Sequence, residues 1–435
     1  MMQVLRIIGF DKTYVKAEGC KLWDSEGNDY LDFLGGYSVF NLGHNCPELN
    51  ETLRDTLGSS WPNLLQMDAP PLSGLLASEL SKRDPTGRLE YAYFGNSGAE
   101  AIECALKFAR AATGRPRLLS ASGGFHGVSM GALSLCGDES WREGFGPFLP
   151  GCSTIPFGDL GELERELRTK DVAGLILEPI QGEGGVREWR SEQWKEIQSL
   201  CRKYGTLLIL DEIQTGMGRT GKFFAFEHWG LEPDLVCLSK ALTNGMVPCS
   251  ATLGTKKVFS SVFSRLDRCM VHSSTFSENN LAMAAGLSVL EQIDRKQLLA
   301  RAERMGQLAK AKIRQAVGDF QLVKEIRGRG LMFAVEFGTP RDFGLRMAWG
   351  ALQRANKGLF GQMITMPLLT KHRILTQVAG HNLNVLKLSP PLTVSETELD
   401  RFVAALTAVV QDCHRLPGGI WNFGMDLAKR ALLEV

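Results

Sequence analysis

The stretch Thr206-Leu-Leu-Ile-Leu210, followed directly by Asp211, decides the fold class of this chain. The run is continuously apolar, which is typical of a strand buried on both faces of a sheet. Two similar runs are Val172-Ala-Gly-Leu-Ile-Leu177 and Asp234-Leu-Val-Cys-Leu238. A helical pattern from about 191 to 204 lies between the runs 172–177 and 206–210. Alternation of buried strands and helices predicts an α/β domain with a mostly parallel sheet.

The same pattern extends in both directions along the chain. A strand is expected at Leu89-Glu-Tyr-Ala-Tyr-Phe94 and a helix at 99–112. Further on, we expect one long helical stretch over 280–317, a strand-rich segment over 323–337 and a helix over 396–413. The last two form a smaller C-terminal domain. The expected divisions are an N-terminal segment that joins the small domain (1–65), a large domain (66–322), the small domain (323–415) and a tail (416–435).

Composition excludes several classes of protein. The 435 residues include 49 Lys+Arg and 48 Asp+Glu, and 44% are hydrophobic, which excludes a disordered or collagen-like chain. The formal net charge of +1 gives no overall basicity, so no nucleic-acid partner is predicted. No run of 18 apolar residues exists, so no transmembrane segment is predicted.

The ten cysteines include no Cys-x-x-Cys pair, and no metal site is predicted. Most lie in apolar surroundings, as Cys104 and Cys237 do, which is typical of reduced core thiols in a cytoplasmic protein.

Three polar residues follow three of the predicted strands: Glu178, Asp211 and Lys240. A lone charged residue after a strand is usually a solvated loop residue, but ligands of open α/β sheets bind beyond the carboxyl ends of the strands. A lysine can form a Schiff base with a carbonyl, and a buried aspartate can keep a pyridinium nitrogen protonated. Three such residues on one rim therefore indicate pyridoxal phosphate chemistry.

A candidate phosphate site lies at Gly95-Asn-Ser-Gly-Ala-Glu100, between a strand and a helix. Ser97 and Glu100 fit a capping box, and Gly98 permits close approach of the backbone. Taken alone the signal is weak, because most caps of this kind only start helices.

Two other motifs are weighed and set aside. Gly216-Met-Gly-Arg-Thr-Gly221 matches a dinucleotide-binding pattern, but five residues separate it from its strand and no clear helix follows. Gly127-Val-Ser-Met-Gly131 matches a nucleophile elbow, but its strand ends several residues earlier.

Across about residues 15–409 the chain resembles the class III aminotransferases, a family of pyridoxal-phosphate enzymes of fold type I. The motifs that carry this resemblance occur in family order and spacing, namely Phe94-Gly-Asn-Ser-Gly-Ala-Glu-Ala101, Gly124-Phe-His-Gly127, Glu178-Pro-Ile-Gln-Gly-Glu-Gly-Gly185, Leu210-Asp-Glu-Ile-Gln-Thr-Gly-Met-Gly-Arg-Thr-Gly221 and Leu238-Ser-Lys-Ala-Leu242. The resemblance implies a large domain with a mostly parallel seven-stranded sheet and a smaller α+β domain.

The resemblance also implies roles for individual residues. Lys240 would bind the cofactor covalently and move the proton. Asp211 would bind the pyridine nitrogen, and Gln214 would reach the ring hydroxyl. Ile213 and Phe125 would pack on opposite faces of the ring, although core packing is the ordinary role of such residues.

Four more assignments follow from the same resemblance. Gly98 and Ala99 would give backbone N–H groups to the phosphate. Thr275 would cap the phosphate of the neighbouring subunit, which implies a homodimer. Glu183 matches an acid that pairs, in many relatives, with an arginine.

Three departures from the family pattern are expected to matter. Ser277-Glu-Asn-Asn280 stands where relatives have Gly-Gly-Asn-Pro, and Lys387 stands where glutamate-using relatives have an arginine. The apolar stretch 358–380 is also longer than in relatives, and either core packing or a substrate tunnel would explain it.

The expected function is transfer of an amino group between a terminal primary amine or aldehyde, diamine-like or with a long apolar chain, and an amino acid or 2-oxo acid. The alternatives are an isomerase (racemase or aminomutase) on the same fold and a cofactor-binding protein without turnover.

Overall fold

The computed structural model describes residues 10–65, 69–381, 383–416, 418–421 and 424. The chain divides into a large unit, Cys46–Leu299, and a small unit that combines Met1–Asn45 with Ala300–Val435. Sequence placed the divisions at 65/66 and 322/323. The large unit begins earlier because α3 (Pro47–Gly58) packs on α10 (Asn280–Arg295). It also ends earlier, since most of the next helix belongs to the small unit. The predicted tail, 416–435, lies mostly outside the described residues.

The large unit is built on a seven-stranded sheet with the order β4-β12-β11-β10-β7-β5-β6. Strand β12 is antiparallel to both of its neighbours, and the other neighbouring pairs are parallel. The mostly parallel seven-stranded fold is therefore confirmed. The strands are β4 (Tyr91–Gly95), β5 (Arg117–Ala121), β6 (Cys152–Ile155), β7 (Val172–Leu177), β10 (Leu207–Asp211), β11 (Leu235–Leu238) and β12 (Ser250–Gly254).

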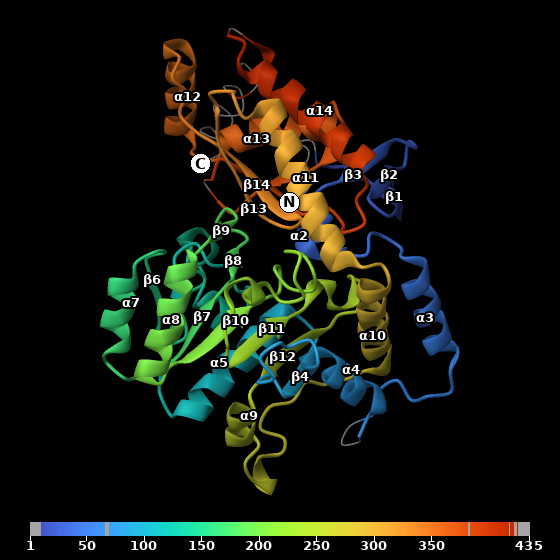
Figure 1. Ribbon diagram of the computed structural model, residues 1–435, viewed down its shortest axis with the longest axis vertical. Coiled ribbons are helices and arrows are strands. Elements are labelled where there is room, and N and C mark those ends of the chain that lie inside the picture. Colours follow the sequence, from blue (N-terminus) through green and yellow to red (C-terminus); the bar gives the residue numbers. More distant parts are fainter. Residues whose placement is uncertain (1–9, 66–68, 382, 417, 422–423, 425–435) are drawn as a thin grey trace. The chain divides into compact units, whose positions relative to one another are not determined.

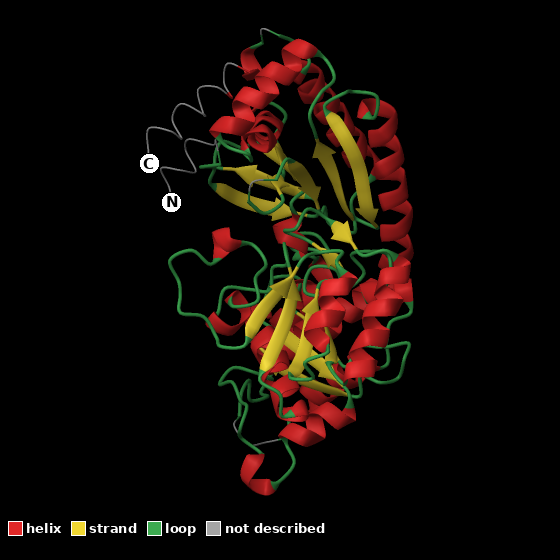
Figure 2. Cartoon of the chain, turned by 90° about the vertical axis from the view of Figure 1, so that its left-hand side faces the viewer, coloured by secondary structure: helices red, strands yellow, loops and turns green. Residues whose placement is uncertain are grey.

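Helices pack around this sheet (Figures 1 and 2). Helix α5 (Gly98–Thr113) places Ile102, Ala105 and Ala109 in a core cluster with Ile176 of β7, and each is fully buried. The other helices of the large unit are α4 (Pro71–Ser81), α6 (Met130–Leu133), α7 (Leu160–Leu167), α8 (Ser191–Tyr204) and α9 (Lys256–Val262).

The prediction of one continuous helix over 280–317 was wrong. Helix α10 ends at Arg295, and α11 runs over Leu298–Val317. Between them Gln297 has φ +50°, which is left-handed and interrupts a right-handed helix. Neither glycine nor proline marks this break in the sequence.

The small unit contains two four-stranded sheets, with the orders β13-β14-β17-β16 and β1-β2-β3-β15. Their strands are β13 (Val323–Arg329), β14 (Met332–Phe337), β16 (Gln377–Val378), β17 (Val385–Leu388), β1 (Tyr14–Glu18), β2 (Lys21–Asp24), β3 (Asp29–Asp32) and β15 (Ile374–Leu375). The helices are α2 (Gly35–Ser38), α11, α12 (Phe343–Ala355), α13 (Leu359–Thr370) and α14 (Glu396–Cys413).

The apolar stretch 358–380 forms part of the core of the small unit. Most of it is α13, whose Phe360, Met363 and Ile364 are fully buried. The Phe360 ring packs against the ring of Trp349 at 4.7 Å between centroids. These contacts favour core packing over a substrate tunnel.

Along the described part of the chain, no helix combines the length and the apolar character needed to cross a bilayer.

Candidate active site

A cavity of about 170 Å³ lies at the carboxyl ends of the parallel strands of the large unit. Its walls come from the segments that follow β4, β5, β7, β10 and β11, which end at the same edge of the sheet. It therefore brings together residues that are far apart in the sequence: Gly98, Ala99, Phe125, His126, Gly127, Glu178, Asp211, Ile213, Gln214 and Lys240. Seven of these were predicted as site residues from the sequence.

Asp211 is the last residue of β10 and is only 4% exposed. Its Oδ1 accepts a hydrogen bond from the backbone N–H of Ile213 at 3.1 Å. Its Oδ2 lies 2.8 Å from Nδ1 of His126, which is also buried. A carboxylate can only accept, so this contact places a proton on Nδ1 of His126. The carboxylate is therefore fixed in one orientation at the base of the cavity.

Lys240 follows β11 and begins a short 3-10 turn, Lys240–Thr243. Its backbone has φ +47°, in the left-handed region that non-glycine residues rarely adopt. Such conformations persist where surrounding structure imposes them, and they concentrate at functional sites. Here the neighbouring Ser239 anchors the turn, because its hydroxyl donates to the carbonyl of Cys249 at 2.8 Å.

The start of α5 forms another wall. Ser97 caps the helix by accepting from the N–H of Glu100 at 3.2 Å. The predicted capping box is only half formed, because the carboxylate of Glu100 accepts from the N–H of Asn96, at 2.7 Å, instead of Ser97. Gly98 and Ala99 then occupy the first helical positions, where N–H groups have no acceptor within the helix. Such a terminus binds anions such as phosphate.

Gly98 also controls the shape of this wall. A Cβ built on Gly98 would lie 2.9 Å from Cδ1 of Ile213, which is closer than side chains approach. The absence of a side chain at Gly98 therefore lets Ile213 lie against the helix terminus.

The side chains of Gln214 and Glu183 contact each other beside the cavity. Nε2 of Gln214 donates to Oε1 of Glu183 at 3.4 Å. Oε1 of Gln214 is buried and has no hydrogen-bond partner among the described residues. Gly182 permits this arrangement, because a Cβ there would lie 2.5 Å from Oε1 of Gln214.

Phe125 lines the cavity from the loop after β5, and its ring packs against Trp141 at 4.8 Å between centroids. The N–H of Phe125 donates to Oε1 of Glu178 at 2.9 Å. Burial raises the pKa of Glu178 to about 7, although His126 opposes the rise. Sequence reasoning placed Glu178 on the rim but gave it no role, and it gave none to His126 or Gly127, although both lie in the quoted Gly124–Gly127 motif.

Glu183 and Thr275 are the two predicted site residues that do not line the cavity, and Thr275 lies on a separate segment that follows β12 and α9. Thr275 is exposed. The preceding residue, Ser274, holds this segment in place, because its hydroxyl accepts a hydrogen bond from Nδ2 of Asn96 at 2.8 Å. At the start of this segment Nδ1 of His272 lies 2.8 Å from Nζ of Lys107. Burial and the charge of Lys107 lower the pKa of His272 to about 4.

The nucleophile-elbow motif has a structural role. The hydroxyl of Ser129 donates to Oε1 of Glu103 at 2.6 Å, and the same oxygen accepts from the N–H of Gly131 at 2.8 Å. The serine therefore fastens the loop after β5 to α5.

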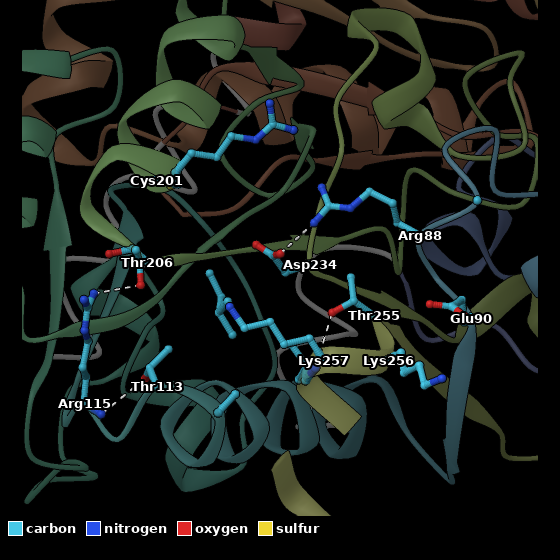
Figure 3. A pocket seen from close by; sticks show the side chains of 16 residues that line it. Arg88, Glu90, Thr113, Arg115, Cys201, Thr206, Asp234, Thr255, Lys256 and Lys257 are labelled. Atoms are coloured by element: carbon cyan, nitrogen blue, oxygen red, sulfur yellow. Dashed lines mark hydrogen bonds and ion pairs between the residues drawn. The ribbon is translucent and has the colours of Figure 1, made fainter. Parts of the chain in front are cut away.

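A larger cavity, of about 840 Å³, lies at the opposite edge of the same sheet (Figure 3). Five of its lining residues are cationic and two are acidic. Arg115 donates to the carbonyls of Val172, Tyr204 and Gly205. Arg88 pairs with Asp234 at 3.1 Å.

Comparisons with known proteins show the family to which this chain belongs. The family model for class-III aminotransferases matches residues 9–410. A putrescine aminotransferase from Pectobacterium atrosepticum is 39% identical over 87% of this chain and 78% of its own length. Aminotransferase PigE from a Serratia species is 35% identical over 95% of this chain, which spans only 52% of PigE.

Among solved structures, the ornithine aminotransferase from Toxoplasma gondii, with PLP partially occupying its active site, has a TM-score of 0.82 at 30% identity, over 93% of this chain and 92% of its own. This chain therefore belongs to the class III aminotransferases, and its cofactor is pyridoxal 5′-phosphate. These comparisons give no support to the isomerase alternative.

The residues present fit this cofactor. The N–H groups of Gly98 and Ala99 suit the phosphate, and the fixed carboxylate of Asp211 suits a protonated ring nitrogen. Oε1 of Gln214 is buried without a partner among the described residues, so it can accept a hydrogen bond from the ring hydroxyl. Lys240 lines the same cavity, and a lysine amine is the group that can form a Schiff base with the aldehyde of this cofactor.

Proposed function

We propose that this chain transfers the amino group of a terminal primary amine lacking an adjacent carboxylate, such as a diamine, to a 2-oxo acid. The observation that carries the proposal is one cavity lined by Lys240, Asp211, Gln214 and the start of α5. Pyridoxal phosphate, when bound, supplies a ring that takes up the negative charge developing at the substrate carbon.

The residues of the chain would divide the remaining work. Asp211, held by His126 and Ile213, would keep a proton on the ring nitrogen. Phe125 and Ile213 would hold the ring between them. Nζ of Lys240 would bind the cofactor covalently. It would then take a proton from the substrate carbon that bears the amino group and return it to the adjoining carbon of the cofactor.

The substrate class follows from Lys387. In the family motif this position carries an arginine in relatives that use glutamate, and arginine grips a carboxylate through two parallel hydrogen bonds. A lysine offers only a point charge. Lys387 is 1% exposed, and its Nζ lies 4.9 Å from the centroid of the Tyr37 ring, so it does not point to solvent. An α-carboxylate should therefore be held less firmly here.

A diamine is favoured over a long apolar chain. The apolar stretch that suggested a tunnel packs as α13 in the core of the small unit. The names of the relatives, a putrescine and an ornithine aminotransferase, also support a terminal amine.

The test compares amines that differ only in the α-carboxylate, namely putrescine with ornithine and cadaverine with lysine. Each is mixed with the purified holoenzyme, and the single-turnover rate is followed by cofactor absorbance. We expect the amine without the carboxylate to react faster in each pair. A consistent preference for ornithine and lysine would overturn the substrate assignment, and amine turnover without consumption of a 2-oxo acid would indicate an isomerase.

The proposal includes a homodimer in which Thr275 completes the site of the neighbouring subunit. Its support is the exposure of Thr275 together with the apolar side chains of Leu266, Met270 and Phe276, which are 90%, 50% and 65% exposed. Several exposed apolar side chains within one short segment are typical of an interface.

Mixing tests this assembly. Lys240→Ala and Thr275→Ala chains should each be inactive or nearly so, and hybrids should regain activity because one of their sites carries both residues. An active monomer in solution would contradict the dimer.

All ten cysteines are unpaired, which supports a cytoplasmic location.

A further inference from the structure

Glu178 connects two loops of the cofactor site through one buried carboxylate. It directly follows β7 and is 4% exposed. Its Oε1 accepts from the N–H of Phe125 at 2.9 Å, and its Oε2 accepts from the N–H of Gly182 at 2.8 Å. These N–H groups belong to the loop after β5 and to the turn between β8 (Ile180–Gln181) and β9 (Arg187–Glu188).

Both loops carry groups that face the cofactor. Phe125 itself lines the cavity. Gly182 lies against the amide of Gln214 and precedes Glu183, which accepts from that amide. A shift of either backbone N–H would therefore move one wall of the cavity.

The surroundings of Glu178 disfavour the ionised form of its carboxyl group. Burial is the largest effect on its pKa, which rises to about 7; His126 lowers the pKa, and Asp211 raises it. A neutral carboxylic acid keeps one good acceptor oxygen and turns the other into a donor, so only the ionised form accepts both bonds well. Hydrogen bonds to an ionised group are also the stronger kind.

A buried glutamate that accepts two hydrogen bonds could serve only to stabilise the fold. Glu212 is such a case: it is buried after β10 and accepts from the hydroxyl of Thr215 and the N–H of Phe226, neither of which lines the cavity. Glu178 differs because both of its donors belong to walls of the site.

We infer that Glu178 is a positioning residue whose ionised carboxylate clamps the Phe125 and Gly182 loops together and so sets the affinity for the cofactor. The inference rests on the proposed function, since it assigns Glu178 to the same site. It does not place Glu178 on the reacting atoms.

The test uses Glu178→Gln, which keeps the shape but loses the charge and one good acceptor. The matched control is Glu196→Gln, on the exposed face of α8. Two quantities are measured without any amine substrate: the dissociation constant of pyridoxal phosphate from the apoprotein, and hydrogen-exchange protection of the Phe125 and Gly182 amides. Because a hydrogen bond to a charged group is lost, we expect about tenfold weaker cofactor binding and lower protection at these two amides. The control should match wild type.

Wild-type protein supplies a second test that needs no variant. Protection of the Phe125 and Gly182 amides, corrected for the intrinsic exchange rate, should fall as the pH is lowered through about 7. Glu178→Gln should remove this pH dependence. Unchanged cofactor affinity and unchanged protection in Glu178→Gln, or protection in wild type that does not vary with pH, would overturn the inference. Failure of transamination alone would instead count against the proposed function.

Discussion

The two edges of the central sheet differ in whether their polar groups already have hydrogen-bond or ion-pair partners. At the amino-terminal edge the larger cavity is rich in cations, but Arg115 donates to three backbone carbonyls. Arg88 pairs with Asp234 (Figure 3). At the carboxyl edge the cavity has about one fifth of that volume, and the amide oxygen of Gln214 and the first N–H groups of α5 await partners. We therefore assign the cofactor to the smaller cavity on the basis of these groups and not of cavity size.

The largest expected difference between the two edges comes from replacing one lysine at each. Lys240→Ala should lose transamination by about 10³-fold or more, because the amine that holds the cofactor and moves the proton is gone. Lys257→Ala, in the larger cavity, should keep the wild-type rate. Steady-state rates of both variants would be measured after each protein is shown to be folded. Wild-type activity in Lys240→Ala would end the proposed mechanism.

Two aspartates allow the same comparison for charge. Asp211→Asn removes the charge that would hold a proton on the ring nitrogen, so a loss of about 10²-fold or more in the rate is expected. Asp234→Asn, at the opposite edge, should affect stability rather than rate, since Asp234 accepts from the N–H of Leu208 and from Arg88. Similar rates for the two variants would mean that Asp211 is not at the ring.

Buried acids at the carboxyl edge should give stability a distinctive pH dependence. Burial raises the pKa of both Glu178 and Glu212 from 4.5 to about 7. Between these values the folded chain holds protons on these two carboxyls that the unfolded chain has lost, so their contribution to the free energy of unfolding should decrease as the pH rises from 4.5 to 7. His272 contributes the opposite trend below 6.5, because its pKa is lowered from 6.5 to about 4. The effect is on the order of 1 to 3 kcal/mol per group.

Calorimetric unfolding of the apoprotein at several pH values would measure this effect. Glu212→Gln should flatten the profile while leaving the cofactor cavity intact. An unchanged profile in Glu212→Gln would show that the fold does not raise the pKa of Glu212.

The smallest expected effect concerns Glu278, in the segment that carries Thr275. Glu278 has φ +62° at the position where the family pattern has its second glycine. Glu278→Gly should therefore raise stability by about 0.5–1 kcal/mol, because glycine adopts this conformation without strain. Glu143→Gly, at a residue outside the left-handed set, should lower it. A loss of stability in Glu278→Gly would show that the glutamate side chain stabilises the turn.

Sequence reasoning succeeded where local signals were strong. The strand 172–177 and the helices 191–204 and 396–413 have the predicted limits. Gly205, left-handed, ends the second of these elements, and the Ser395–Glu398 capping box starts the third. Seven of the nine predicted site residues line one cavity because they follow strands that end at the same edge.

The failures depend on tertiary contacts. Nothing in the apolar pattern of 280–317 marks the left-handed Gln297. The contacts of His126 with Asp211 and of Glu178 with Phe125 join residues 85 and 53 positions apart, so spacing within a motif could not predict them.

The central claim is that the cofactor binds at the carboxyl edge, on Lys240. Borohydride reduction of the holoenzyme fixes pyridoxal phosphate on the lysine to which it is bound, and peptide mass spectrometry then locates the modified residue. We predict one modified peptide, carrying the cofactor on Lys240. Cofactor fixed instead on Lys256 or Lys257, at the opposite edge, or on no lysine at all, would contradict the account.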